Sequence, residues 1–191
     1  VTDNGCGIEY EDVPKAFISH ATSKISSVSD LDSISTLGFR GEALASVCAV
    51  SKVDLMTATA GSDTGTRYII EGGEEKYIDD VGSPVGTTLV VKDLFYNIPA
   101  RLKFLKKDVQ EGNYIASILE NIAVSYPQIS FKFIRDGKLN FSTPGDGNLK
   151  SAIYAVFGKE YTESLLPVEY EANGISVTGF TGKPTSGRGS R

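Results

Sequence analysis

Residues 52–93 constrain the fold of this chain more than any other stretch. Four short segments rich in β-branched and aromatic residues follow one another here, with glycine-containing turns between them. The segments are residues 52–60, 65–71, 76–81 and 86–93, and the turns are Gly61-Ser62-Asp63, Gly72-Gly73 and Gly82-Ser83-Pro84. Because short strands joined by tight turns usually pair with their neighbours, the stretch predicts an antiparallel meander.

Helical segments flank this predicted sheet. The acidic residues and the early Pro14 predict a helix starting in residues 11–17, residues 41–50 predict a buried helix, and residues 97–105 predict a short helix entered through proline. The clearest helical period runs over residues 108–126, where one apolar stripe contains Ile115, Ile118, Leu119, Ile122 and Tyr126. Strands and helices mix without β-α-β regularity, so an α+β fold is predicted.

The glycine-rich residues 144–148 form the strongest linker signal. Before them, residues 129–143 predict a hairpin that turns at Asp136-Gly137. After them come a predicted helix that ends at Gly158 and two predicted strands, at about residues 165–171 and 174–181. We therefore expect a first domain over residues 1–146 and the beginning of a second, small α/β domain over residues 147–191.

The composition excludes several classes of protein. No apolar run approaches the ~20 residues of a membrane span, and two cysteines in 191 residues do not form a disulfide framework. With one histidine in the chain, neither a usual four-ligand zinc site nor a serine-histidine triad is supported. These features favour an intracellular protein, and the start at Val1 without an initiator methionine indicates a piece of a longer chain.

The charge distribution leaves one candidate nucleic-acid contact. A net charge of −5 argues against a domain dedicated to nucleic acid. A local basic cluster nevertheless occurs in "ARLKFLKKD", formed by Arg101, Lys103, Lys106 and Lys107. This cluster either meets DNA phosphates weakly and without sequence preference, or forms a solvated helix end.

The first candidate for ligand binding is the opening turn, "DNGCG". Gly5 and Gly7 lack a Cβ, so the backbone can approach a flat ligand closely. The Asp3 carboxylate can then accept a hydrogen bond from an exocyclic amino group such as that of adenine. The same letters are also typical of a hairpin turn without any ligand.

Two further segments are candidates for phosphate binding. Gly38 and Gly41 come directly before a predicted helix, whose free N–H groups favour an anion. "ATSKI" lies in a long polar loop over residues 19–40 and offers Thr22, Ser23 and Lys24, which suit either phosphate oxygens or solvent. The spacing of the glycines fits neither a P-loop nor a Rossmann fingerprint.

Taken in order, these segments resemble a known family. "DNGCGI", "HATSKI", "LGFRGEALASV", "PVGTTLVVKDLFYNIPAR" and "KFLK" together are similar to the MutL family of DNA mismatch repair proteins, within the GHKL-type ATPase superfamily. The resemblance covers nearly all of residues 1–107. It implies an antiparallel sheet backed by helices on one face, and an ATP site formed by Asp3, Gly5, Gly7, Thr22, Ser23, Lys24, Gly38, Phe39, Arg40, Gly41 and Thr87.

The resemblance also implies how such a site works. ATP and Mg²⁺ would act as a switch that dimerises two such domains, and mismatch-recognition and downstream repair proteins would be the partners. "HATSKI" and "PVGTT" favour a bacterial member, in the cytoplasm or nucleoid. In the family, the general base and the Mg²⁺-binding asparagine lie on a helix that no segment of this sequence matches, so this chain alone is expected to be inactive. The alternatives are a non-catalytic scaffold with a vestigial pocket and a topoisomerase-type ATPase.

Overall fold

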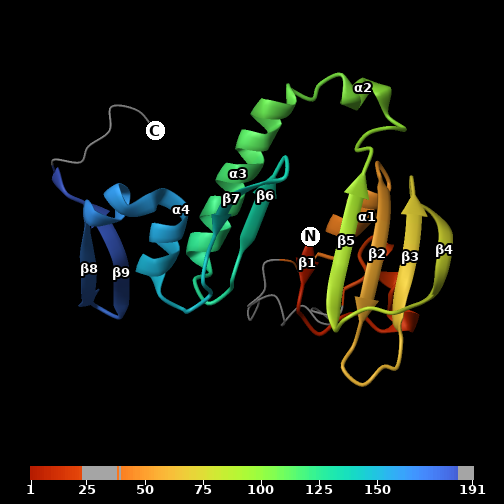
Figure 1. The fold of residues 1–191 in the computed structure, drawn as a ribbon, viewed down its shortest axis with the longest axis horizontal. Coiled ribbons are helices and arrows are strands. Elements are labelled where there is room, and N and C mark those ends of the chain that lie inside the picture. Colours follow the sequence, from red (N-terminus) through yellow and green to blue (C-terminus); the bar gives the residue numbers. More distant parts are fainter. Residues whose placement is uncertain (23–37, 39, 185–191) are drawn as a thin grey trace. The chain divides into compact units, whose positions relative to one another are not determined.

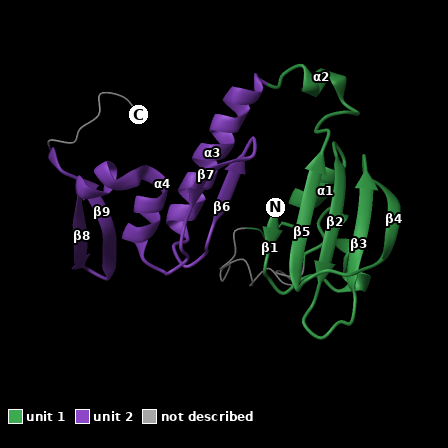
Figure 2. Cartoon of the chain, viewed as in Figure 1, with its two compact units in different colours: residues 1–105 green, residues 106–191 purple. Residues whose placement is uncertain are grey.

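The computed structural model describes residues 1–22, 38 and 40–184 of the chain. The chain divides into two compact units, residues 1–105 and residues 106–191 (Figure 2). The domain boundary expected at residues 146/147 lies inside the second unit, and it stays a prediction about the domains of the longer protein.

The first unit is built on a five-stranded sheet whose paired strands are all antiparallel (Figure 1). Its strands are β1 (Thr2–Asp3), β2 (Lys52–Ala58), β3 (Gly65–Glu71), β4 (Glu74–Val81) and β5 (Gly86–Lys92), in the order β1-β5-β2-β3-β4. The α+β fold class and the positions of β2, β3, β4 and β5 are confirmed.

The pairing of β5 corrects the predicted meander. Strands β2, β3 and β4 follow one another as expected, but β5 returns to pair with β2, and Thr57 lies opposite Thr87. The connection to β5 passes over the start of β3, where a Cβ on Gly65 would lie 2.8 Å from the Cβ of Ser83. The absent side chain at Gly65 makes room for this crossing, which a strand pattern alone does not indicate.

One face of the sheet carries the core of this unit. Val53, Leu55, Tyr68 and Ile70 are buried from the strands, and they pack with Val13, Phe17 and Cys48 from outside the sheet. Helix α1 (Ala43–Cys48) contributes Cys48. Two short 3-10 turns lie beside it: Val13 directly follows the first, Tyr10–Asp12, and Phe17 is the last residue of the second, Lys15–Phe17. The opposite face of the sheet is more polar, since Arg67 donates two hydrogen bonds to Asp54 at 3.0 and 2.7 Å.

The two 3-10 turns stand where one helix starting in residues 11–17 was predicted. Pro14 separates them, because its ring conflicts with the carbonyl four residues earlier in a continuous α-helix and its nitrogen has no hydrogen to donate. The chain instead closes tight turns, with the Phe17 N–H donating to the Pro14 carbonyl at 3.2 Å. The prediction of one continuous helix here is wrong, and Phe17, in the second turn, is buried.

The first unit ends in helix α2 (Pro99–Leu102), which begins at a proline as predicted. The second unit contains α3 (Asp108–Ser125), the hairpin β6 (Lys132–Arg135) and β7 (Lys138–Ser142), α4 (Leu149–Glu163), and the hairpin β8 (Leu165–Ala172) and β9 (Ile175–Gly182). Asp136 and Gly137 both have positive φ in the β6–β7 turn, as the hairpin prediction requires. No helix in the described part of the chain is both long and apolar enough to span a membrane.

Two helices of the second unit differ from expectation. In α3 the buried residues are Ala116 and Ala123, whereas Ile115 and Ile118 of the predicted stripe are 52% and 60% exposed. The segment α4 consists of two helical stretches that meet at Gly158, whose backbone is not helical (φ 82°, ψ 177°). The first stretch stops at Gly158 as predicted, and the second stretch, which runs on to Glu163, was not predicted. The Thr162 hydroxyl supports the continuation by donating to the Gly158 carbonyl at 2.8 Å.

Candidate functional site

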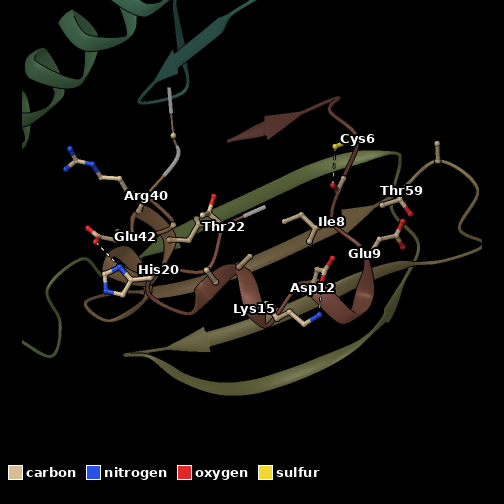
Figure 3. Close-up of a pocket in the computed structure, with 18 residues that line it drawn as sticks. Cys6, Ile8, Glu9, Asp12, Lys15, His20, Thr22, Arg40, Glu42 and Thr59 are labelled. Carbon is tan, nitrogen blue, oxygen red and sulfur yellow. Dashed lines mark hydrogen bonds and ion pairs between the residues drawn. The ribbon is translucent and has the colours of Figure 1, made fainter. Parts of the chain in front are cut away.

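A cleft of about 1470 Å³ opens beside the helical side of the sheet in the first unit (Figure 3). Three segments line it: the turn after β1, the two 3-10 turns, and the backbone on either side of residues 23–37. Thr59 and Ala60, directly after β2, complete the lining. Its volume exceeds the roughly 300–1,000 Å³ of most small-molecule sites, so a nucleotide-sized ligand fits within it.

Gly7 forms part of the first wall, between Cys6 and Ile8. Its φ is +75°, and a Cβ there would overlap the carbonyl oxygen of Ala58 at the end of β2. Any other residue would therefore strain the backbone and push the turn away from the sheet. The sequence predicted a glycine here so that the backbone could approach a ligand. The structure adds a second reason for a glycine at this position, which is the close packing of the wall against β2.

The second wall is formed where residues 20–22 meet residues 40–42. The His20 N–H donates to the Gly41 carbonyl at 2.9 Å, and Gly41, at φ +63°, has no room for a Cβ beside the Ala21 carbonyl. The His20 Nδ1 and Glu42 Oε1 atoms lie 3.2 Å apart, and their side chains point toward one another (Figure 3). This backbone junction brings Thr22, Arg40 and Gly41 to one cleft.

The remaining predicted residues lie in different places. Gly38 also lines the cleft, in front of the six-residue helix α1. Asp3, Gly5 and Thr87 do not line it but form a hydrogen-bonded group that continues from Cys6 and Gly7. In this group the Asp3 Oδ1 accepts from the Gly5 N–H at 2.9 Å and from the Thr87 N–H at 3.1 Å. Ser23, Lys24 and Phe39 lie outside the described residues.

Several residues that line the cleft were not predicted from the sequence. Asp12, Lys15 and Ala16 belong to the 3-10 turns, which face the core through Val13 and Phe17 and the cleft through their other side. Lys15 donates to Asp12 at 2.7 Å, and this hydrogen bond and the charge of the carboxylate raise the pKa of the lysine. The alternation of apolar and polar residues in this segment could have indicated which residues face the cleft. It assigns them correctly only when the segment forms two 3-10 turns and not one helix.

The acidic residues of the cleft do not form a metal site by themselves. Among the described residues, no three His, Cys, Asp or Glu side chains are grouped so that they could hold a metal ion. Cys6 is exposed at the cleft, whereas Cys48 is buried in the core, where burial raises the pKa of its thiol. Cys6 is therefore the more accessible of the two thiols.

The predicted basic cluster is divided between the two units. Arg101 and Lys103 belong to the first unit, and Lys106 and Lys107 to the second. The Lys106 Nζ donates to the Tyr114 hydroxyl at 2.9 Å and lies 4.7 Å from the centre of its ring. Contact of this cluster with DNA stays a prediction.

Comparison with known proteins identifies the family. Over all 191 residues, the chain is 52% identical to the DNA mismatch repair protein MutL of Agathobacter rectalis, and 47% and 44% identical to those of Clostridium botulinum and Clostridium tetani. The chain belongs to the MutL family. It spans 30%, 29% and 31% of the lengths of these three MutL proteins. No protein-family model matches it.

Solved MutL structures have the same fold. The Aquifex aeolicus MutL ATPase domain complexed with ADP superimposes with a TM-score of 0.77 at 28% identity, covering 98% of this chain and 65% of that domain. A second structure of the Aquifex MutL ATPase domain gives a TM-score of 0.70 at 26% identity and covers 95% of this chain. The chain therefore has the fold of part of a MutL ATPase domain, as the sequence resemblance implied.

Proposed function

We propose that this chain forms the nucleotide-binding part of a DNA mismatch repair ATPase. The supporting observation is the cleft between the Gly7 wall and the Gly41 wall, in a fold whose Aquifex counterpart is complexed with ADP. Tight glycine turns suit a nucleotide because they let backbone N–H groups approach phosphates and bases without a side chain between them. The activity and partners of the whole protein are part of this proposal.

Within the proposal, the hydrogen-bonded group beside the cleft and the cleft itself have separate roles. The Asp3 carboxylate and Thr87 take the adenine end, next to Gly5 and Gly7. Thr22, Ser23 and Lys24, together with Gly38, Phe39, Arg40 and Gly41, take the phosphates. Arg40 suits this role because its guanidinium carries a permanent charge and several donors that match phosphate oxygens.

The proposal extends to the whole protein as a switch. ATP binding brings two such domains together as a homodimer, and hydrolysis releases them. Mismatch-recognition proteins and downstream repair proteins bind the dimer. DNA binds weakly through contacts to its phosphates. Mg²⁺ would neutralise phosphate charge during hydrolysis, but the described residues offer no ligand set for it. The protein works inside the cell.

Replacing Asp3 with alanine tests the base-binding end of the cleft. The change leaves the adenine amino group without its acceptor, which costs roughly 1–3 kcal/mol. In the full-length protein, Asp3→Ala should weaken ATP binding by about tenfold, since each 1.4 kcal/mol is a factor of ten. Equilibrium titration with a fluorescent ATP analogue measures the change. Asp63→Ala, at an exposed turn of the same unit, is the matched control, and an equal affinity of the two variants would contradict the assignment.

A further inference from the structure

The Thr57 hydroxyl is buried behind the cleft and lies outside the proposed set of nucleotide contacts. Its residue is 0% exposed, near the end of β2. The Ile8 N–H donates to Thr57 Oγ1 at 2.9 Å, and Thr57 Oγ1 lies 3.0 Å from the Gly86 carbonyl oxygen and 3.0 Å from Thr87 Oγ1. Thr57 therefore joins the cleft wall at Ile8 to the strand that carries Thr87.

The hydrogens in this group can be assigned from the chemistry of its members. A hydroxyl has one hydrogen to donate and two lone pairs to accept with. The Gly86 carbonyl has no hydrogen, so the 3.0 Å contact requires the hydrogen of Thr57. The Thr57–Thr87 contact then requires the hydrogen of Thr87. With one bond donated and two accepted, the buried Thr57 hydroxyl is fully satisfied.

This assignment fixes what Thr87 offers to a ligand. Its only hydroxyl hydrogen is used toward Thr57, so the outer side of Thr87 Oγ1 presents lone pairs alone. Thr87 is half-buried, and its own N–H is bound to the carboxylate of Asp3, the residue opposite it in the sheet. An ionised carboxylate is also a pure acceptor. The base-binding end of the site therefore carries two neighbouring acceptors and no side-chain donor from this pair.

We propose that Thr57 is a positioning residue that makes the site selective for a base with an exocyclic amino group. The inference rests on the proposed nucleotide function of the cleft. By holding the Thr87 hydrogen, Thr57 leaves an acceptor that pairs with the 6-amino group of adenine. A 6-oxo purine presents lone pairs at the same place, so its oxygen and Thr87 Oγ1 are both acceptors and cannot form a hydrogen bond. Leaving both groups unpaired weakens binding of the 6-oxo purine.

ATP and inosine triphosphate form the matched probe pair, because they differ only in the amino or oxo group at position 6 and its ring hydrogen. In the full-length protein, Thr57→Val frees the Thr87 hydroxyl to rotate and donate to a 6-oxo group. The preference for ATP over inosine triphosphate should then fall about tenfold, while Thr57→Ser, which keeps the hydroxyl, retains it. Equilibrium titration of both nucleotides measures the two preferences.

A second readout needs no nucleotide. The Ile8 amide loses its acceptor in Thr57→Val, so its hydrogen exchange should become faster than in wild type and in Thr57→Ser. Should Thr57→Val not fold, Thr87→Val removes the oriented acceptor directly and should lower the ATP preference by a similar factor.

The outcomes separate the inference from the function on which it rests. Loss of preference in Thr57→Val with rescue in Thr57→Ser supports the proposal. A wild-type protein that binds ATP, together with a Thr57→Val or Thr87→Val variant whose ATP preference is unchanged, overturns the role of Thr57 and leaves the nucleotide site standing. A wild-type protein that binds neither nucleotide overturns both.

Discussion

The purified 191-residue chain is expected to release phosphate from ATP no faster than background, whereas the full-length protein is expected to hydrolyse ATP. The MutL resemblance assigns the general base and the Mg²⁺-binding asparagine to a helix that no segment of this sequence matches, and the chain covers 65% of the Aquifex ATPase domain. Loss of a general base typically costs ~10²–10⁴-fold in rate, and loss of the metal ligand removes further electrostatic stabilisation of the transition state.

Steady-state phosphate release from the two purified proteins, at equal concentration and in the same Mg²⁺ buffer, decides this point. Circular dichroism of the short chain serves as the control that it is folded. Equal turnover by the two proteins would place the catalytic residues within residues 1–191. It would contradict the assignment of the general base and the Mg²⁺-binding asparagine to a helix outside this sequence.

Gly7→Ala is expected to cause a large loss of stability. The new Cβ would overlap the Ala58 carbonyl at a backbone φ of +75°. The left-handed conformation costs about 1–2 kcal/mol for a residue with a Cβ, and forcing an extra carbon into packed structure costs about 1–3 kcal/mol more. Chemical denaturation of the full-length protein should therefore show a loss of about 2–5 kcal/mol in the free energy of unfolding of this domain.

Gly61→Ala separates the two contributions. Gly61 belongs to the same unit and has φ +97°, but a Cβ there would meet nothing within 4 Å. It should lose only the conformational part, about 1–2 kcal/mol. If Gly7→Ala destabilises the protein no more than Gly61→Ala does, the close contact between Gly7 and β2 is not a constraint on the wall of the cleft.

The strands could be predicted from the sequence because the turn residues between them are locally decisive. Their pairing could not, since β5 pairs with β2, which lies about 30 residues earlier in the chain, and the alternation of residues within a strand does not show which distant strand is its partner. A similar limit applies to α3, where the helical period was right but small residues, Ala116 and Ala123, form the buried face. Large apolar residues mark a face as apolar, but they do not show which neighbour, if any, covers it.

In the candidate site too, some residues could be predicted from the sequence and others could not. Gly7 and Gly41 stand out in the sequence because closely spaced glycines mark turns where the backbone needs a positive φ or a close approach, and both line the cleft. His20 and Thr57 do not stand out, because their roles arise from residues distant in the chain, Gly41 and Glu42 for the first and Ile8 and Gly86 for the second. A buried threonine in a strand looks like any other β-branched residue until its partners are known.

Alkylation of Cys6 measures occupancy of the cleft most directly. Cys6 is exposed and lines the cleft, whereas Cys48 is 2% exposed with a raised thiol pKa, so a thiol reagent distinguishes the two. In the full-length protein, Cys6 is identified as the labelled residue by peptide mass spectrometry, and its rate is followed with and without ATP. At an ATP concentration about 100 times its Kd, when nearly all sites are filled, we expect the alkylation rate of Cys6 to fall by about tenfold or more. An alkylation rate that stays the same while ATP is bound elsewhere on the protein would contradict the claim that this cleft is the nucleotide site.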